Sequence, residues 1–471
     1  MLAAGDWSGA PLVSRLAAVQ AESRPPAVGP LSVGKVNPRY FATPAGQPVY
    51  LTGSHTWFSF VDSGPKFPPV PFDYDAYLRF LVRHDHNFIR LWSEQLPAFQ
   101  DPEGRRHHVW PLPWERPGPG LAQDGQPRFD LTKLDPAYFE RLRARTAAAG
   151  EKGVYVAVML FQAWNVVMRP AQGGWDFHPF RKTNNVNGVD ADADGNGVGI
   201  EFFTLAVPEV VRLQEAYVRR VVQAVNDLDN VLYEIANETG PVSTDWHYHM
   251  IDVVRREQDR LGRRLPIGMT YQAIESASSD EALYASAAEW ISPGDVAYKT
   301  DPPPADGRKV LLPDTDHLWG IGGNTGWVWT SFLRGLNPIF MDPYDQRRAE
   351  MWEPVRRAMG QTRRFAQRLD LAAALPRPDL ASSGYCLAKV GHQYLVYLPS
   401  ASARRVGLVQ RPARLEVTVD VTDVASDLTV EWFDPANDKT LTDRAVTGGA
   451  KRRFTAPFTG EALLYLVTAR P

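Results

Sequence analysis

Residues 230–238 of the chain read NVLYEIANE. It is a short apolar run that ends in a polar pair, as expected for a buried strand that delivers side chains to one end of a parallel sheet. Seven similar runs alternate with longer amphipathic stretches: VYLTG (49–53), NFIRLW (87–92), VYVAVMLF (154–161), LPIGMTY (265–271), EWIS (289–292), KVLLPD (309–314) and NPIFMD (337–342). Eight strands joined by helical crossovers predict an α/β fold, a (β/α)8 barrel of the TIM type.

The last hundred residues follow a different pattern. Runs such as HQYLVYLPS (392–400) and LTVEWFDP (428–435) alternate with a period of two and are separated by turn residues. This pattern predicts a small antiparallel β-sandwich after the barrel. We therefore expect an N-terminal arm at 1–30, a barrel at 31–378 and a C-terminal β-sandwich at 379–471.

The composition excludes several classes of protein and partner. Hydrophobic residues make up 44% and charged residues 22% of the 471 residues, an ordinary globular balance. The 51 basic and 54 acidic side chains give a formal charge of −3, so we expect no nucleic-acid and no membrane partner. Cys386 is the single cysteine, which excludes an intrachain disulfide. The 14 tryptophans favour a sugar as ligand, because indole rings stack on sugar faces.

The N-terminal residues do not resemble a secretory signal, since Asp6 and Arg15 interrupt their apolar runs. We expect a cytoplasmic protein, or an exported one whose signal is absent from this sequence. The oligomeric state stays open at this point.

The candidate catalytic residues are carboxylic acids at strand ends. Glu238 closes the run at 230–238, beside the amide of Asn237, which can hydrogen-bond a substrate. The alternative is that Glu238 caps the next helix, although Ser243 and its neighbours can serve as caps. Glycoside hydrolysis needs a second carboxyl group on the other side of the scissile bond. Asp314 and Asp316 follow the strand at 309–314, and we favour Asp314 because it continues the strand directly.

Other polar and aromatic side chains follow the same strands and are candidate substrate contacts. Each has a structural alternative, because a single Trp is usually a core residue and Arg90 could be a buried ion-pair partner. A tryptophan cluster extends into a Gly-rich loop and includes Trp327 and Trp329. The full set of predicted substrate-binding residues is His55, Trp57, Arg90, Glu94, Trp164, Asn237, His317, Trp319 and Asp342.

The order of these motifs resembles that of the clan A glycoside hydrolases. Asn87-Phe88-Ile89-Arg90 is similar to their Asn-x-x-Arg, in which the arginine braces the nucleophile, and Asn237-Glu238 is similar to their acid/base pair. Residues 37–58 resemble the first strand of the apiosidase-like group, and residues 394–400 and 429–438 resemble the C-terminal domain called collagen-binding in such proteins. The chain departs from the clan in carrying Asp on the seventh strand, where the clan carries a nucleophilic Glu. The resemblance implies a retaining mechanism.

A separate motif predicts a calcium site. Asp190, Asp192, Asp194-Gly195 and Glu201 fit D-x-[DN]-x-[DN]-G-x5-E, with Asn196 at the seventh position. The flanking segments do not read clearly as the two helices of an EF-hand, and a solvated acidic loop is the alternative. A bound Ca²⁺ would have a structural role, and no organic cofactor is expected.

These observations predict a glycosidase acting on an oligo- or polysaccharide from plants or microbes. Glu238 would be the acid/base and Asp314 or Asp316 the nucleophile. The alternative is a non-catalytic carbohydrate-binding protein on a barrel scaffold, which the unusual Asp on the seventh strand keeps open.

Overall fold

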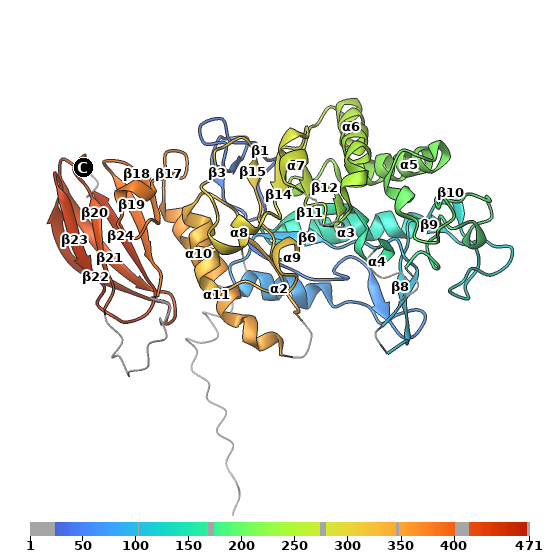
Figure 1. Cartoon of the computed structure of the whole chain (residues 1–471), viewed down its shortest axis with the longest axis horizontal. Helices are drawn as coiled ribbons and strands as arrows, with labels where there is room; N and C mark the ends of the chain where they lie inside the picture. Colours follow the sequence, from blue (N-terminus) through green and yellow to red (C-terminus); the bar gives the residue numbers. More distant parts are fainter. Residues whose placement is uncertain are drawn as a thin grey trace, which may run out of the picture.

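The computed structural model describes residues 24–101, 103–167, 174–273, 279–344, 348–400 and 414–468. The molecule is elongated, with the C-terminal β-structure at one end and the parallel strands with their helices in the centre (Figure 1). Within the described residues, none of the helices combines the length and the apolar character needed to cross a bilayer.

The centre of the fold is a curled parallel sheet. Six strands pair in the order β15-β14-β13-β12-β11-β6, and two more, β4 and β16, pair with each other in parallel. Backbone hydrogen bonds link this pair to both edges of the six-stranded sheet. Beside β6, Asn87 N donates to Thr52 O at 3.0 Å, and beside β15, Ile339 N donates to Pro313 O at 3.0 Å. The strands are β4 (Gly53–His55), β6 (Phe88–Leu91), β11 (Tyr155–Gln162), β12 (Val231–Asn237), β13 (Ile267–Thr270), β14 (Trp290–Ser292), β15 (Val310–Leu311) and β16 (Ile339–Met341).

The first predicted strand differs from the structure. Residues Pro48–Val49 form β3, which pairs antiparallel with β2 (Phe41–Ala42), and the parallel strand begins only at Gly53. The apolar run at 49–53 therefore joins two different sheets.

Side chains alternate between the inside and the outside of the curled sheet. On β12, Val231 and Tyr233 belong to the apolar cluster that contacts the helices, whereas Leu232 belongs to the inner cluster. The same period of two places Phe88 inside on β6. Gly268 leaves room for Trp290 inside the sheet, because a Cβ at Gly268 would lie 1.9 Å from the indole. The same alternation turns Arg90 and Glu234 inward, because each lies two residues after an inner apolar residue, Phe88 or Leu232.

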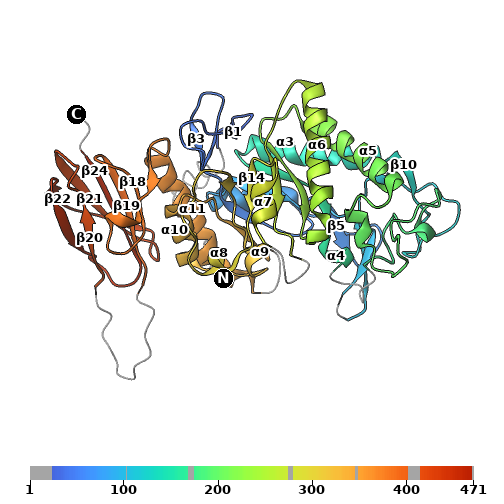
Figure 2. The ribbon, with the colours of Figure 1, turned by 45° about the horizontal axis from the view of Figure 1, so that its top comes forward.

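Helices cover the outer face of the sheet. They start and stop where the sequence has caps: Asp73 accepts from Ala76 N, Asp135 accepts from Ala137 N, and Gly262 ends a helix with φ 73°. Figure 2 shows α3, α5 and α6 together on one side. The long helices are α2 (Tyr74–Arg83), α3 (Pro136–Glu151), α5 (Pro208–Val225), α6 (Thr244–Leu261) and α11 (Glu353–Arg368).

The segments that follow β4 and β6 carry β-structure that the sequence did not predict. Three strands pair in the order β5-β8-β7, and β9 pairs with β10. In Figure 1 β8, β9 and β10 lie at the end of the molecule opposite the C-terminal sheets. The bounds are β5 (Asp62–Gly64), β7 (Ala98–Gln100), β8 (Arg106–Trp110), β9 (Trp114–Glu115) and β10 (Asp130–Leu134).

The C-terminal part consists of two antiparallel sheets. One has six strands in the order β17-β18-β19-β24-β21-β22, and the other pairs β20 with β23. An apolar cluster that includes Val396, Trp432, Val419 and Phe454 joins the two sheets. The bounds are β17 (Leu375–Pro376), β18 (Cys386–Lys389), β19 (Gln393–Leu398), β20 (Glu416–Asp420), β21 (Asp427–Asp434), β22 (Lys439–Thr447), β23 (Lys451–Thr455) and β24 (Ala462–Thr468).

The other face of the six-stranded sheet packs against α11 and α10 (Thr325–Leu333). Trp329 and Phe365 from these helices form one buried cluster with Tyr397 and Phe433 from the sheet. Both helices lie between the C-terminal sheets and the parallel sheet in Figure 1. Trp329 is therefore a core residue of this contact rather than a sugar contact.

The described part of the N-terminal arm is attached to the first part of the chain. The guanidinium of Arg24 donates to the carbonyl oxygens of His86 and Val82, and Ala27 N donates to Gly150 O at 2.8 Å. Residues 1–23 of the predicted arm lie outside the described residues.

Candidate active site

A cavity of about 1330 Å³ opens at the carboxyl ends of the parallel strands. Its walls come from the segments that follow these strands, which is the position expected for a site on a parallel α/β fold. Three carboxylic acids line it: Glu238, Asp316 and Asp73, which is the N-cap of α2. Aromatic rings make up much of the remaining wall: Trp57, Phe58, Phe72, Trp92, Phe99, Trp164, Trp319 and Tyr344.

Arg90 lies beneath this cavity and is fully buried. Its guanidinium donates through Nε and Nη2 to Glu234 at 2.8 and 2.5 Å, and through Nη1 to Asp314 at 2.9 Å and Asp316 at 3.1 Å. Nη2 also donates to Oδ1 of Asn237. One cation thus holds three carboxyl groups and an amide in fixed positions, a geometry that the planar guanidinium allows and a lysine does not.

Glu238 follows β12 directly and has a left-handed backbone conformation, with φ 51°. This conformation is unfavourable for a residue with a Cβ and is found where function fixes the backbone. Asn237 Nδ2 donates to Oε2 of Glu238 at 3.0 Å. Burial, with a further contribution from the charge of Asp316, raises the pKa of Glu238 well above its ordinary value. Glu238 is not a helix cap.

Asp314 and Asp316 lie in different surroundings. Asp314 is fully buried, accepts from Asp316 N at 2.9 Å and is the N-cap of the short helix α9 (Thr315–Leu318). Its carboxylate also accepts from His55 Nε2 at 2.8 Å. Burial alone would raise the pKa of Asp314, but His55 and Arg90 hold it below its ordinary value.

Asp316 lines the cavity, whereas Asp314 does not. Burial raises the pKa of Asp316 to about 6, against the opposing effect of Arg90. Of the two aspartates that the sequence offered, the structure therefore places Asp316 at the cavity wall and Asp314, the one favoured from the sequence, beneath it.

His317 links Asn237, the last residue of β12, to Ser292, the last residue of β14. Ser292 Oγ donates to Nδ1 at 2.7 Å, and Nε2 lies 3.2 Å from Oδ1 of Asn237. Because that amide oxygen is an acceptor, Nε2 carries the proton. Burial and Arg90 lower the pKa of His317 to about 3, so the ring is neutral.

Three predicted substrate contacts are covered by other residues. His55 stacks on Trp92 and binds Asp314. Glu94 is buried and accepts from the backbone of Gln95 and from Asn165 Nδ2, at 3.0 and 2.6 Å. Both carboxylate oxygens of Asp342 accept from Arg356, and Asp342 does not line the cavity. Trp57, Trp164, His317 and Trp319 do line it, and Arg90 and Asn237 lie beneath.

Glu234 was missed by the sequence reasoning. Its carboxylate is fully buried and makes a bidentate ion pair with Arg90. The signal was available, because residue 234 shares the inner face of β12 with Leu232, where an unpaired charge would be very costly. Gln162 was also missed, and its Oε1 accepts from Asn237 Nδ2 at 3.2 Å.

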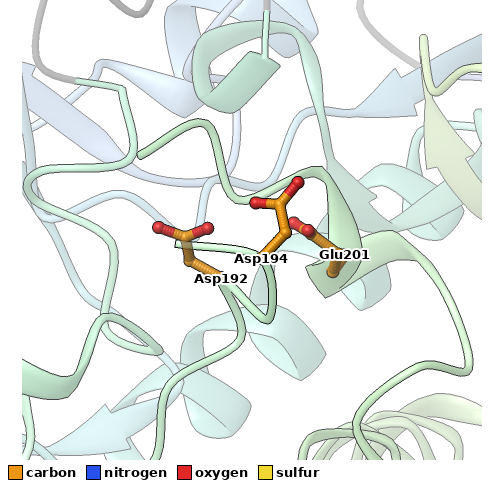
Figure 3. Close-up of side chains that lie close together, drawn as sticks. All are labelled: Asp192, Asp194 and Glu201. Atoms are coloured by element: carbon orange, nitrogen blue, oxygen red, sulfur yellow. The ribbon is translucent and has the colours of Figure 1, made fainter. Parts of the chain in front are cut away.

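The predicted calcium loop brings together three of its five ligands. Carboxylate oxygens of Asp192, Asp194 and Glu201 lie within 4.8 Å of one another (Figure 3). Asp190 instead accepts from Asp192 N, and Asn196 Nδ2 donates to Asp194 at 2.8 Å. A short 3-10 turn, Ile200–Phe203, follows the loop in place of the exiting helix of an EF-hand.

Comparisons with known proteins agree with this architecture. A family described as "Domain of unknown function (DUF6298)" matches residues 83–287. No curated protein matches the chain in sequence. A solved structure described as a glycoside hydrolase is similar at 10% identity with a TM-score of 0.61, covering 95% of this chain and 99% of that one. A glycoside hydrolase family 5 structure from Bacteroides vulgatus ATCC 8482 is similar at 9% identity with a TM-score of 0.57, covering 93% of each chain. The chain therefore has a fold found in glycoside hydrolases.

Proposed function

We propose that the protein is a glycoside hydrolase in which Glu238 is the general acid/base and Asp316 the nucleophile. The observation that carries the proposal is that these two carboxyl groups line one aromatic cavity, with Arg90 bound to Asp316 and Asn237 bound to Glu238. A pair of carboxyl groups with different environments is the requirement of this chemistry.

The two surroundings suit the two roles. The raised pKa of Glu238 keeps it protonated, as a general acid must be. Arg90 donates to Oδ2 of Asp316, which stabilises its charged form and leaves Oδ1 for attack. Since Asn237 binds Oε2 of Glu238, its Oε1 is the oxygen that would exchange a proton with the substrate.

The proposed reaction has two steps. Oδ1 of Asp316 attacks the anomeric carbon as the bond to the leaving oxygen breaks, and that oxygen takes the proton of Glu238. Glu238 then removes a proton from water, whose oxygen attacks the same carbon and releases Asp316. Two inversions give net retention, so the first-formed product should have the configuration of the substrate.

We further infer that the eight parallel strands form a closed (β/α)8 barrel, and that the two C-terminal sheets form a β-sandwich. The hydrogen bonds from Asn87 to Thr52 and from Ile339 to Pro313 support closure, and the shared apolar cluster supports the sandwich. That the chain is an apiosidase-like protein with a C-terminal domain of the collagen-binding type stays a prediction from the sequence.

We also propose that Ca²⁺ binds the loop at 190–201 and stabilises it. Oδ1 of Asp192 and Oε2 of Glu201 are buried and have no hydrogen-bond partner among the described residues. Carboxylate oxygens without donors are the ligands that Ca²⁺ prefers.

A panel of aryl glycosides and polysaccharides tests the central proposal. Wild type should cleave at least one member. Glu238→Gln should lose about 100-fold or more in turnover on unactivated substrates, and less on aryl glycosides with good leaving groups. Asp316→Asn should abolish turnover on all of them.

Asp245→Asn is the matched control, because Asp245 is an exposed carboxylate in the first turn of α6. It should retain wild-type activity. Binding of a glycan with unchanged turnover in Glu238→Gln would contradict the acid/base role. Binding by the wild type with no hydrolysis of any member would favour the non-catalytic carbohydrate-binding alternative.

A further inference from the structure

Lys299 gives the cavity a positive charge that the proposed chemistry does not use. It lies near the end of the short helix α8 (Val296–Thr300) and lines the same cavity as Glu238 and Asp316. Among the lining residues that the structure describes it is the one Lys or Arg, and the lining histidine, His317, is neutral. The lining acids are Glu238, Asp316 and Asp73, and Asp73 caps α2 by accepting from Ala76 N at 2.8 Å.

The ammonium of Lys299 lies over an aromatic ring. Its Nζ is 5.3 Å from the centroid of the Trp319 indole, which also lines the cavity. A cation–π contact of this kind positions a lysine without neutralising it. The Trp319 indole also packs edge-on against Trp327, which holds the ring in place.

No carboxylate lies within ion-pair distance of Lys299 among the described residues. The acidic neighbours on its own element have other partners: Asp295 accepts from Ala297 N at 2.8 Å as the cap of α8, and Asp301 accepts from Tyr385 Oη at 3.0 Å. The guanidinium of Arg90 is likewise occupied by Glu234 and Asp314. Within the described part of the chain, Lys299 is therefore the lining cation that is available to a ligand.

We propose that the cavity binds an acidic glycan, with a negatively charged sugar unit against Trp319 and its anionic substituent on Lys299. The inference rests on the proposed glycosidase function and adds the substrate class to it. The ring would stack on the indole, and a carboxylate or a sulfate ester would accept from the ammonium. A neutral sugar needs no such charge, since hydroxyl and amide groups satisfy its hydroxyls.

The test compares acidic and neutral glycans on intact protein by calorimetric titration and by hydrolysis. The panel holds neutral, uronate-containing and sulfated oligosaccharides. It includes oligogalacturonides beside their methyl esters, and sulfated galactans beside their desulfated forms. The two matched pairs distinguish a carboxylate from a sulfate as the recognised group. We expect the tightest ligands to be acidic and their affinity to fall as salt is raised.

Two variants isolate the charge. Lys299→Met keeps most of the aliphatic stem and should weaken binding of acidic ligands about tenfold, the effect of losing one charged hydrogen bond. Lys299→Arg should retain most of the affinity. Lys35→Met removes an exposed lysine outside the lining of the cavity and should change nothing.

The outcomes separate this inference from the proposed function. Preference for neutral glycans, or equal losses on neutral and acidic ligands in Lys299→Met, would overturn the substrate class and leave the glycosidase proposal intact. Failure of the wild type to bind or cleave any member would overturn both.

Discussion

Asp314 and Asp316 are two residues apart, yet their surroundings give them opposite properties. Asp314 receives hydrogen bonds from His55, Arg90 and the backbone of Asp316, so its charge is stabilised in a dry site. Asp316 has one bond to Arg90 and lines the cavity. Asp314 therefore serves the site as a positioning group and Asp316 as the reactive one in our proposal.

The pKa shifts predict the pH dependence of kcat/KM. Asp316 must be deprotonated to attack, so activity should rise with pH through about 6. Glu238 must be protonated to donate, so activity should fall again as pH passes its raised pKa. The profile of the wild type should be a bell.

Glu238→Gln should abolish the alkaline limb on substrates with good leaving groups and keep the acid limb. The loss of the alkaline limb is checked by measuring rates with an activated aryl glycoside from about pH 4 to about pH 10. An alkaline limb that persists in Glu238→Gln would assign it to another group.

The choice between the two aspartates could not be predicted from the sequence. It depends on where α9 begins, because a helix starting at Thr315 makes Asp314 its cap and turns that carboxylate inward. Element boundaries are fixed by tertiary packing that a local pattern does not contain. The sequence also placed Glu94 and Asp342 at the substrate. A polar residue that follows a strand can face either the cavity or a buried partner, and the local pattern does not distinguish the two.

At the scale of elements, the parallel strands were predictable because each is an apolar run with a polar end. Arg90 and Glu238 followed from this, since alternation and strand ends fix where such side chains lie. The hairpins β7–β8 and β9–β10 were not predictable, because their strands are short and their pairing depends on contacts with the rest of the fold.

The loop at 190–201 should couple calcium binding to stability. A ligand that binds only the folded protein raises the free energy of unfolding, by about 2.7 kcal/mol at a hundredfold excess over Kd. We expect a chelator to lower the melting temperature and Ca²⁺ to restore it.

Asp194→Asn with Glu201→Gln should remove this response, while Asp245→Asn should retain it. The measurement is a thermal scan of protein first stripped of metal and then titrated with Ca²⁺ or Mg²⁺. A melting temperature that Ca²⁺ leaves unchanged in metal-free protein would rule out the site.

At the scale of the whole molecule, the C-terminal sheets are packed as part of one structure. The cluster of Trp329, Phe365, Tyr397 and Phe433 is buried between helices and sheet, and Gln361 donates to Pro435 O at 2.9 Å. An interface this apolar predicts joint unfolding of both parts. β19 and β24 are buried on both faces along most of their length, which agrees with their nearly continuous apolar sequences, QYLVYL and ALLYLVT.

Calorimetry should therefore show a single transition for the whole chain. Trp329→Ala should lower the free energy of unfolding by about 3–5 kcal/mol through the cavity it leaves. It should move that single transition as a unit. Two separated transitions in the wild type, with Trp329→Ala affecting one of them, would show that the sheets are an independent domain.

In the proposed reaction Asp316 forms a covalent bond to the sugar. The most direct measurement is trapping with a 2-deoxy-2-fluoro glycoside of the cleaved sugar, followed by peptide mass spectrometry. We predict a stoichiometric adduct on Asp316, absent in Asp316→Asn. An adduct on Asp314, or an inverted first-formed product with no adduct, would contradict it.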